Sequence, residues 1–147
     1  MLKLNRVASK LMREVGVNAA TDITGYGLIG HIMEIVEKSG VQIRLSARTV
    51  PLLEGAQRYA REGRLPGGGG RNVAYYMSLA SPSVTIEADI PQTLVELMFD
   101  PQTSGGLLIS VPQKRAAQLE AAFQDANEQI WQIGTVEEGL GLVVTFA

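Results

Sequence analysis

This sequence contains no cysteine and a single histidine, His31. The absence of cysteine excludes disulfide bonds, thiolate nucleophiles and cysteine metal sites. A Ser-His-Asp site would have to use His31, so we expect no catalytic residue from this chain alone. A chain without cysteine also fits the reducing cytoplasm, which is the location that we expect.

Neither sign of charge dominates, because 13 basic and 15 acidic residues leave a net charge of −2. This balance argues against a nucleic-acid partner, which would require a broad basic face. No apolar run approaches the ~18 residues that span a bilayer, and residues 1–6 lack the apolar core of a signal peptide. We therefore expect a soluble protein without a membrane partner.

The 147 residues, 46% hydrophobic and 19% charged, suit one globular domain. Apolar spacing predicts helices at 4–15, 28–39, 51–62, 91–100 and 112–126, and strands at 41–45, 84–86, 107–111, 130–133 and 140–146. We expect the last two strands to form a hairpin, and both Tyr75–Met77 and Trp131 to pack in the core or at an edge or interface. The pattern predicts an α+β fold, with a mixed β-sheet flanked by helices.

Residues 20–31, Ala-Thr-Asp-Ile-Thr-Gly-Tyr-Gly-Leu-Ile-Gly-His, gather unusual chemistry before a helix. Glycines and a helix N-terminus favour phosphate, whereas the Asp22 carboxylate repels it unless Mg²⁺ lies between them. The alternative is a structural loop capped by Asp22 or Thr24. His31 is either a hydrogen-bonded packing residue or a ligand contact, and the first interpretation is favoured.

Two further segments are unusual in composition. Residues 65–72, Leu-Pro-Gly-Gly-Gly-Gly-Arg-Asn, predict a flexible linker or a loop that wraps an anionic ligand or a neighbouring domain. Residues 100–106, Asp-Pro-Gln-Thr-Ser-Gly-Gly, predict a polar turn, either purely structural or able to order a neighbouring loop.

Together, the motifs at 20–31, at 66–72 and at 100–108 resemble, in order, the C-terminal domain of the selenophosphate synthetase (selenide, water dikinase) family. The first motif is shared across the aminoimidazole ribonucleotide synthetase-like superfamily, whereas all three together are specific to the selenophosphate branch. The resemblance covers nearly the whole chain. One departure is Gly69, where the family usually has threonine, so a hydroxyl is absent there.

The resemblance implies an enzyme that converts selenide, ATP and water into selenophosphate, AMP and phosphate with Mg²⁺. It implies that residues 1–147 are the C-terminal half of a larger enzyme, lacking the N-terminal ATP-binding domain with its catalytic Cys or Sec and Lys. The fragment alone is expected to be inactive, and a homodimer is expected.

The resemblance also implies site residues. Asp22 matches the aspartate that this domain contributes to the Mg²⁺–phosphate cluster, while Thr21, Thr24 and Gly25 shape its loop. Asn72 lies in a family-marking loop near the interdomain cleft, and we expect Thr21, Thr24, Gly25 and Asn72 to be the cofactor-binding residues. Two alternatives stay open: the corresponding domain of another superfamily member, such as aminoimidazole ribonucleotide synthetase, or a non-catalytic scaffold module.

Overall fold

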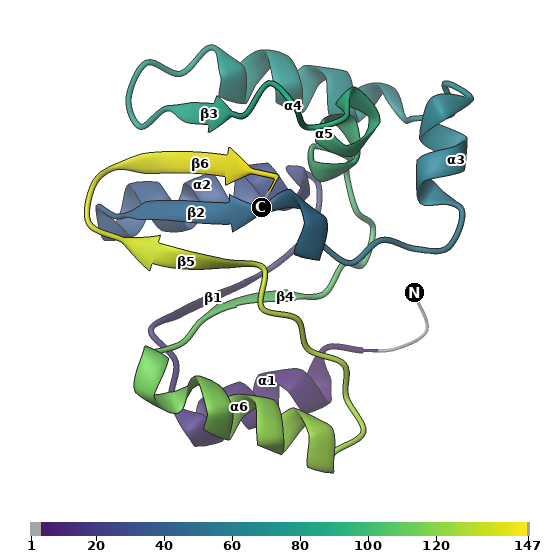
Figure 1. Cartoon of the computed structure of the whole chain (residues 1–147). Helices are drawn as coiled ribbons and strands as arrows, with labels where there is room; N and C mark the ends of the chain where they lie inside the picture. The colour runs from purple at the N-terminus through teal and green to yellow at the C-terminus, as the bar shows by residue number, and fades with distance from the viewer. Residues whose placement is uncertain (1–3, 147) are drawn as a thin grey trace.

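A computed structural model describes residues 4–146 of the chain (Figure 1). Its helices are α1 (Arg6–Val15), α2 (Gly27–Ser39), α3 (Ala56–Arg61), α4 (Gly67–Met77), α5 (Gln92–Met98) and α6 (Gln113–Asp125), with a short 3₁₀ turn at Ala47–Thr49. Its strands are β1 (Ala19–Asp22), β2 (Gln42–Ser46), β3 (Val84–Ile86), β4 (Leu107–Ser110), β5 (Gly134–Glu137) and β6 (Gly141–Thr145). The predicted α+β class is confirmed.

The strands form two separate sheets. The larger one has the order β3-β6-β2-β5 and is mixed, because β6 runs parallel to both β3 and β2 whereas β5 runs antiparallel to β2 (Figure 1). The smaller one is an antiparallel ribbon of β1 and β4, in which Asp22 lies opposite Leu107. The ribbon matters most here because its end carries Asp22.

The main core forms between α2 and the larger sheet. Helix α2 buries Ile29, Ile32 and Val36, which recur at helical spacing, and the strands bury Leu45 and Val144 against them. The helix ends at Gly40, whose left-handed backbone at φ 64° lets its N–H donate to the carbonyl of Val36. The helix predicted at 28–39 is confirmed over its whole length.

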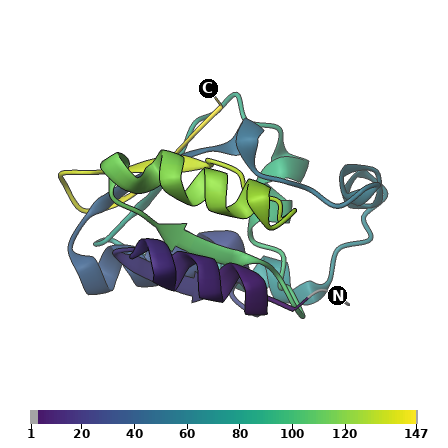
Figure 2. The same cartoon turned by 90° about the horizontal axis from the view of Figure 1, so that it is seen from below.

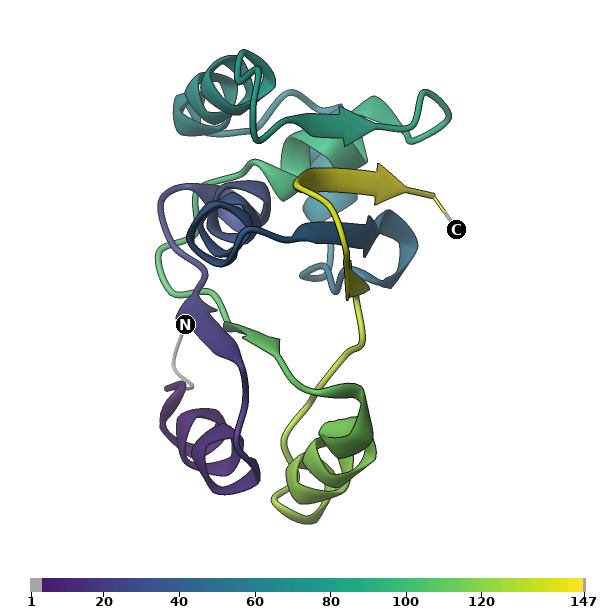
Figure 3. The same ribbon diagram turned by 90° about the vertical axis from the view of Figure 1, so that its left-hand side faces the viewer.

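A second, smaller core lies beyond the ribbon. Val15 of α1 packs with Leu119 and Phe123 of α6, and Ile109 of β4 contacts the same cluster. Seen from below, α1 and α6 run side by side beneath the ribbon, and the side view shows them as a layer of their own (Figures 2 and 3). Two apolar residues of the helix predicted at 4–15 do not join this core, because Leu4, which precedes α1, and Val7 are exposed.

The glycine run is not a linker. Residues Gly67 to Gly70 form the first turn of α4, which begins after Pro66. A Cβ at Gly68 would lie 2.6 Å from Pro101 Cγ, so close packing against Pro101 requires a glycine in the turn. Tertiary contact thus overrides the poor helix propensity of glycine. In the rest of this helix Tyr76 is buried as predicted, whereas Tyr75 and Met77 are exposed.

The predicted hairpin near the C-terminus is wrong. Residues 130–133 are not a strand, and β5 begins only at Gly134. Strand β2 lies between β5 and β6, so the two strands are joined in sequence but are not paired with each other. Gly134 allows this arrangement, because a Cβ there would collide with the carbonyl oxygen of Arg44 on β2. Trp131, predicted to be packed, is 50% exposed.

The helix predicted from Pro51 begins only at Ala56, because Gly55 before it has φ 80°.

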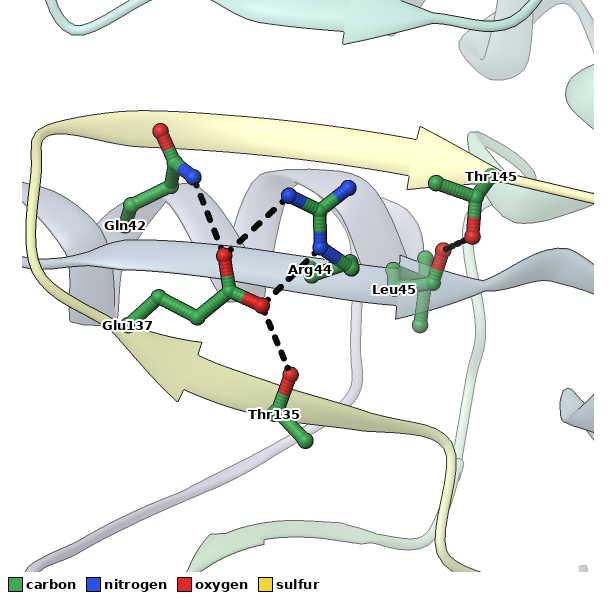
Figure 4. Close-up of polar contacts among 6 residues, drawn as sticks. All are labelled: Gln42, Arg44, Leu45, Thr135, Glu137 and Thr145. Carbon is green, nitrogen blue, oxygen red and sulfur yellow. Dashed lines mark hydrogen bonds and ion pairs between the residues drawn. The ribbon is translucent and has the colours of Figure 1, made fainter. Parts of the chain in front are cut away.

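An ion pair joins two strands of the larger sheet. Across β2 and β5, Arg44 donates to both carboxylate oxygens of Glu137, at 2.9 and 3.2 Å (Figure 4). Within residues 4–146 no helix combines the length and apolar content needed to cross a bilayer.

Candidate functional site

Asp22 is the last residue of β1 and is exposed at the end of the ribbon. Alternation along the strand leaves Thr21 half-buried and turns Asp22 outward. The Thr21 hydroxyl donates to the carbonyl oxygen of Asp22 at 3.2 Å. Within the part of the chain that the structure describes, no side-chain hydrogen bond or ion pair engages the Asp22 carboxylate, so its oxygens are available to a ligand.

We call residues 22–26 the Asp22 loop. Backbone hydrogen bonds attach it to residues 102–106: Ile23 and the 105–106 glycines exchange two at 3.0 Å, and the N–H of Gln102 donates to the carbonyl of Thr24 at 3.0 Å. A Cβ at Gly105 would collide with the carbonyl oxygen of Ile23. The third motif therefore orders the first, which is one of the two predicted roles for it.

The second motif joins the same cluster through Asn72 of α4. Its side-chain amide donates to the carbonyl oxygens of Gly25 and Phe99, each at 3.0 Å. Because Gly68 on the same helix packs against Pro101, α4 contacts both of the other motifs. Three segments that are far apart in sequence thus meet around the Asp22 loop.

His31 lies behind this loop and is 5% exposed. Its Nε2 accepts from the Thr24 N–H at 3.0 Å, and its Nδ1 lies 2.9 Å from Oε2 of Glu34. The favoured interpretation, a hydrogen-bonded packing residue, is confirmed. Glu34 was missed by the sequence reasoning, although its place three residues after His31 on a helix was the available signal.

Gly27 is fixed by its backbone at the entry to α2. It has φ 69°, and a Cβ on it would lie 2.7 Å from the carbonyl carbon of Phe99. Its N–H donates to the carbonyl of Thr24 at 3.1 Å. This amide is therefore engaged by the loop itself, and the segment is more a shaped turn than a self-contained phosphate cradle.

Asp100 is a second carboxylate in the cluster that sequence reasoning did not single out. Its Oδ2 accepts from Nε2 of Gln102 at 3.0 Å, whereas its Oδ1 is buried without a hydrogen-bond partner among residues 4–146. Burial raises the pKa of Asp100, an effect that the hydrogen bond from Gln102 partly opposes. Asp100 is thus a poorly solvated carboxyl group whose hydrogen bond holds the side chain of Gln102 beside the loop.

The predicted site residues have different surroundings. Asp22 and Gly25 are exposed, whereas the hydroxyl of Thr24 lies 3.1 Å from His31 Nε2 and the amide of Asn72 is engaged with two carbonyls. Among the described residues no three His, Cys, Asp or Glu side chains gather as a metal site. A lone outward carboxylate fits Mg²⁺, which accepts one or two protein ligands when phosphate and water supply the others.

Curated proteins of similar sequence share one name, selenide, water dikinase. Among curated proteins, the chain is 49% identical over 119 residues to a selenide, water dikinase of Caldanaerobacter subterraneus subsp. tengcongensis, covering 81% of this chain and 33% of that protein. It is 40% identical over 134 residues to the Bordetella bronchiseptica selenide, water dikinase, covering 91% and 37%. The chain therefore spans about a third of the length of these relatives.

Solved structures show the same fold at low sequence identity. A thiamine-monophosphate kinase of Aquifex aeolicus matches with TM-score 0.55 at 19% identity, covering 97% of this chain and 36% of that one. The enzyme of Stenotrophomonas maltophilia matches with TM-score 0.54 at 16% identity, covering 87% and 31%. The model of one family, described as AIR synthase related protein, C-terminal domain, matches residues 1–147. This chain therefore belongs to the family of AIR synthase related C-terminal domains.

Proposed function

We propose that this chain is the C-terminal domain of a selenide, water dikinase, which makes selenophosphate from selenide, ATP and water. The names of its relatives support this assignment, and their greater length supports a preceding ATP-binding domain as its partner. The main structural support is that the three motifs contact one another around Asp22, whose carboxylate is exposed and makes no side-chain hydrogen bond or ion pair among residues 4–146.

In this proposal Asp22 binds Mg²⁺ at a cleft between the two domains. Bound there, Mg²⁺ supplies positive charge that offsets the charge of the ATP phosphates. The chain's own contribution is positioning: Thr21 and Thr24 shape the backbone on either side of Asp22, and Asn72 holds Gly25 in place. The nucleotide and the remaining metal ligands come from the other domain.

The test replaces Asp22 by Asn in the enzyme that contains this chain and its preceding domain. The amide keeps the shape of the carboxylate and removes its charge, so Mg²⁺-dependent ATP turnover should fall by about 100-fold, in line with losses of metal-site groups. Asp89→Asn is the matched control, because Asp89 is an exposed aspartate in the β3–α5 connection. Turnover equal to that of the control would refute metal binding and favour a scaffold module.

A second experiment tests whether selenophosphate formation requires both domains. The 147-residue chain alone, incubated with selenide, ATP and Mg²⁺, should form no selenophosphate by ³¹P NMR. Addition of the separately produced N-terminal domain should restore formation if the two halves associate. Robust synthesis by the chain alone would contradict the proposal.

We also propose self-association, because the surface exposes large apolar side chains that include Leu53, Tyr75 and Trp131. Sedimentation velocity over a range of concentrations should show a dimer. A monomer at the highest concentration would exclude this part of the proposal.

A further inference from the structure

We propose that His31 is a positioning residue for the Asp22 loop, and that it acts as a hydrogen-bond acceptor whose protonation releases the loop. The catalytic consequence of this inference rests on the proposed function. Its structural part concerns only the contacts within this chain.

The contacts of His31 define its tautomer. The backbone N–H of Thr24 points to Nε2 at 3.0 Å, and a backbone N–H can only donate. Nε2 therefore carries no proton, and the neutral imidazole holds its proton on Nδ1. That proton is donated to the carboxylate of Glu34 across 2.9 Å, which favours the same tautomer.

Thr24 is the residue through which this acceptor controls the loop. Its N–H depends on His31, while its carbonyl accepts from the N–H groups of Gly27 and Gln102. Because His31 is 5% exposed, water does not readily replace the imidazole as acceptor. Loss of the acceptor would therefore leave the Thr24 N–H unpaired. Thr24 lies two residues after Asp22, where the loop joins both α2 and residues 102–106.

Protonation of His31 removes this acceptor. An imidazolium carries N–H groups at both ring nitrogens, so Nε2 would face the Thr24 N–H with a proton of its own. The Thr24 hydroxyl oxygen, 3.1 Å from Nε2, is the nearest group that can accept that proton. The Thr24 N–H would then lack its acceptor, and the Asp22 loop should become less ordered when His31 is protonated.

Several other ionisable groups lie on or near α2. Tyr26 lies beside the imidazole, with ring centroids 5.6 Å apart. Burial, with a smaller effect of Glu34, raises the pKa of Tyr76 to about 12, so this phenol stays neutral. The remaining charged or titratable groups on α2 and on the elements packed against it are Glu37 and Lys38 of α2, Asp22 of β1, Arg44 of β2, Arg71 and Tyr75 of α4, and Glu96 of α5.

The first test is NMR of the ¹⁵N-labelled 147-residue chain. Since His31 is the only histidine, a single imidazole is observed. We expect the Nδ1–H tautomer, a scalar coupling between the Thr24 amide and Nε2, and loss of Thr24 amide protection at the midpoint at which the imidazole protonates. An Nε2–H tautomer, or Thr24 protection that does not change through that titration, would overturn the inference.

The second test uses variants in the two-domain enzyme. His31→Gln supplies an amide oxygen that accepts but does not titrate, whereas His31→Phe removes the acceptor. We expect the turnover of His31→Phe to fall at least about tenfold, because the Thr24 N–H is left buried and unpaired. We expect His31→Gln to keep most of the wild-type turnover and to show a flatter acid limb of the pH profile. An unchanged acid limb in His31→Gln would refute the catalytic consequence.

Glu34→Gln adds a charge-specific readout, because it removes the negative charge beside Nδ1 and weakens the hydrogen bond that favours the Nδ1–H tautomer. We expect a smaller coupling between the Thr24 amide and Nε2. Glu37→Gln, an exposed change on the same helix, is its control. Equal couplings in the two variants would count against the role of Glu34. If Asp22→Asn were inert while the NMR results held, the proposed function alone would fail, so the two failures are distinguishable.

Discussion

The side-chain amide of Asn72 donates to the carbonyl oxygen of Gly25 at 3.0 Å, across 47 positions of sequence. The same nitrogen donates to the carbonyl oxygen of Phe99 at 3.0 Å. One side chain on α4 therefore joins the Asp22 loop to Phe99, the residue that precedes residues 100–106.

Replacement of Asn72 by Ala should destabilise the fold by about 1–2 kcal/mol, because the carbonyl of Phe99 loses a donor in a partly buried place and that of Gly25 loses one at the surface. Urea unfolding measures the change. Asn127→Ala is unsuitable as a control because Asn127 has φ 54°, so Gln57→Ala on the exposed face of α3 serves instead. Equal stability of the Asn72 and Gln57 variants would show that the hydrogen bonds contribute little.

The glycines at the start of α4 should respond in opposite directions to alanine. Gly68→Ala brings a Cβ to 2.6 Å from Pro101 Cγ and should cost about 1–3 kcal/mol through overpacking. Gly70→Ala meets nothing within 4 Å and should stabilise the helix by about 0.5–1 kcal/mol. Thermal unfolding of both variants checks this, and stabilisation by both would exclude close packing at Pro101.

Gly105 and Gly106 form a similar pair next to the site. A Cβ at Gly105 would collide with the carbonyl oxygen of Ile23, whereas one at Gly106 meets nothing within 4 Å. Gly105→Ala should cost about 1–3 kcal/mol and shift the amide signals of the Asp22 loop, while Gly106→Ala should stay within about 0.5 kcal/mol. Unfolding curves and ¹⁵N-HSQC spectra provide the comparison. Matching spectra for the two variants would contradict this contact.

The Arg44–Glu137 pair predicts an acid-dependent contribution to stability. Hydrogen bonding from Arg44 lowers the pKa of Glu137 below the ordinary glutamate value. A carboxyl whose pKa is lower in the folded state stabilises above its unfolded pKa, and this contribution is lost as the pH falls through the folded pKa. Glu137→Gln should therefore reduce the loss of stability as the pH falls below the ordinary glutamate pKa of about 4.3.

The control for this pair is Glu138→Gln, the exposed neighbour. Urea midpoints measured across the acid range give the slope for each variant. The pair is exposed to solvent, so the effect should weaken in high salt. A Glu137→Gln slope that matches that of Glu138→Gln would exclude the expected coupling.

Elements with a clear local period could be predicted from the sequence. Helix α2 has its apolar residues on one stripe and ends at a glycine, and β2 alternates buried and exposed residues. The first turn of α4 could not be predicted, because its stability comes from packing against Pro101, which is 33 positions from Gly68 and leaves no local signal. The hairpin was wrong for a related reason, since adjacency in sequence favoured pairing of two strands that β2 separates.

The candidate site was partly predictable. The helix that follows residues 20–26 could be predicted from its apolar spacing, whereas Mg²⁺ binding by Asp22 stays a prediction. The roles of Asn72, Gln102 and His31 depend on hydrogen bonds to backbone groups, which the sequence does not specify. Only the fold could bring the three motifs together and show that Thr24 connects His31 with Gln102.

The place of β2 between β5 and β6 has a consequence for biosynthesis. Both neighbours of β2 come from residues 134–145, which leave the ribosome about 90 residues after β2 has been made, and β3 joins the sheet only through β6. The larger sheet therefore assembles late, through contacts between distant parts of the chain, which slow folding. A nascent chain that stops before residue 134 loses the centre of this sheet and not merely its edge, and it exposes the apolar stripe of α2 to chaperones or to degradation.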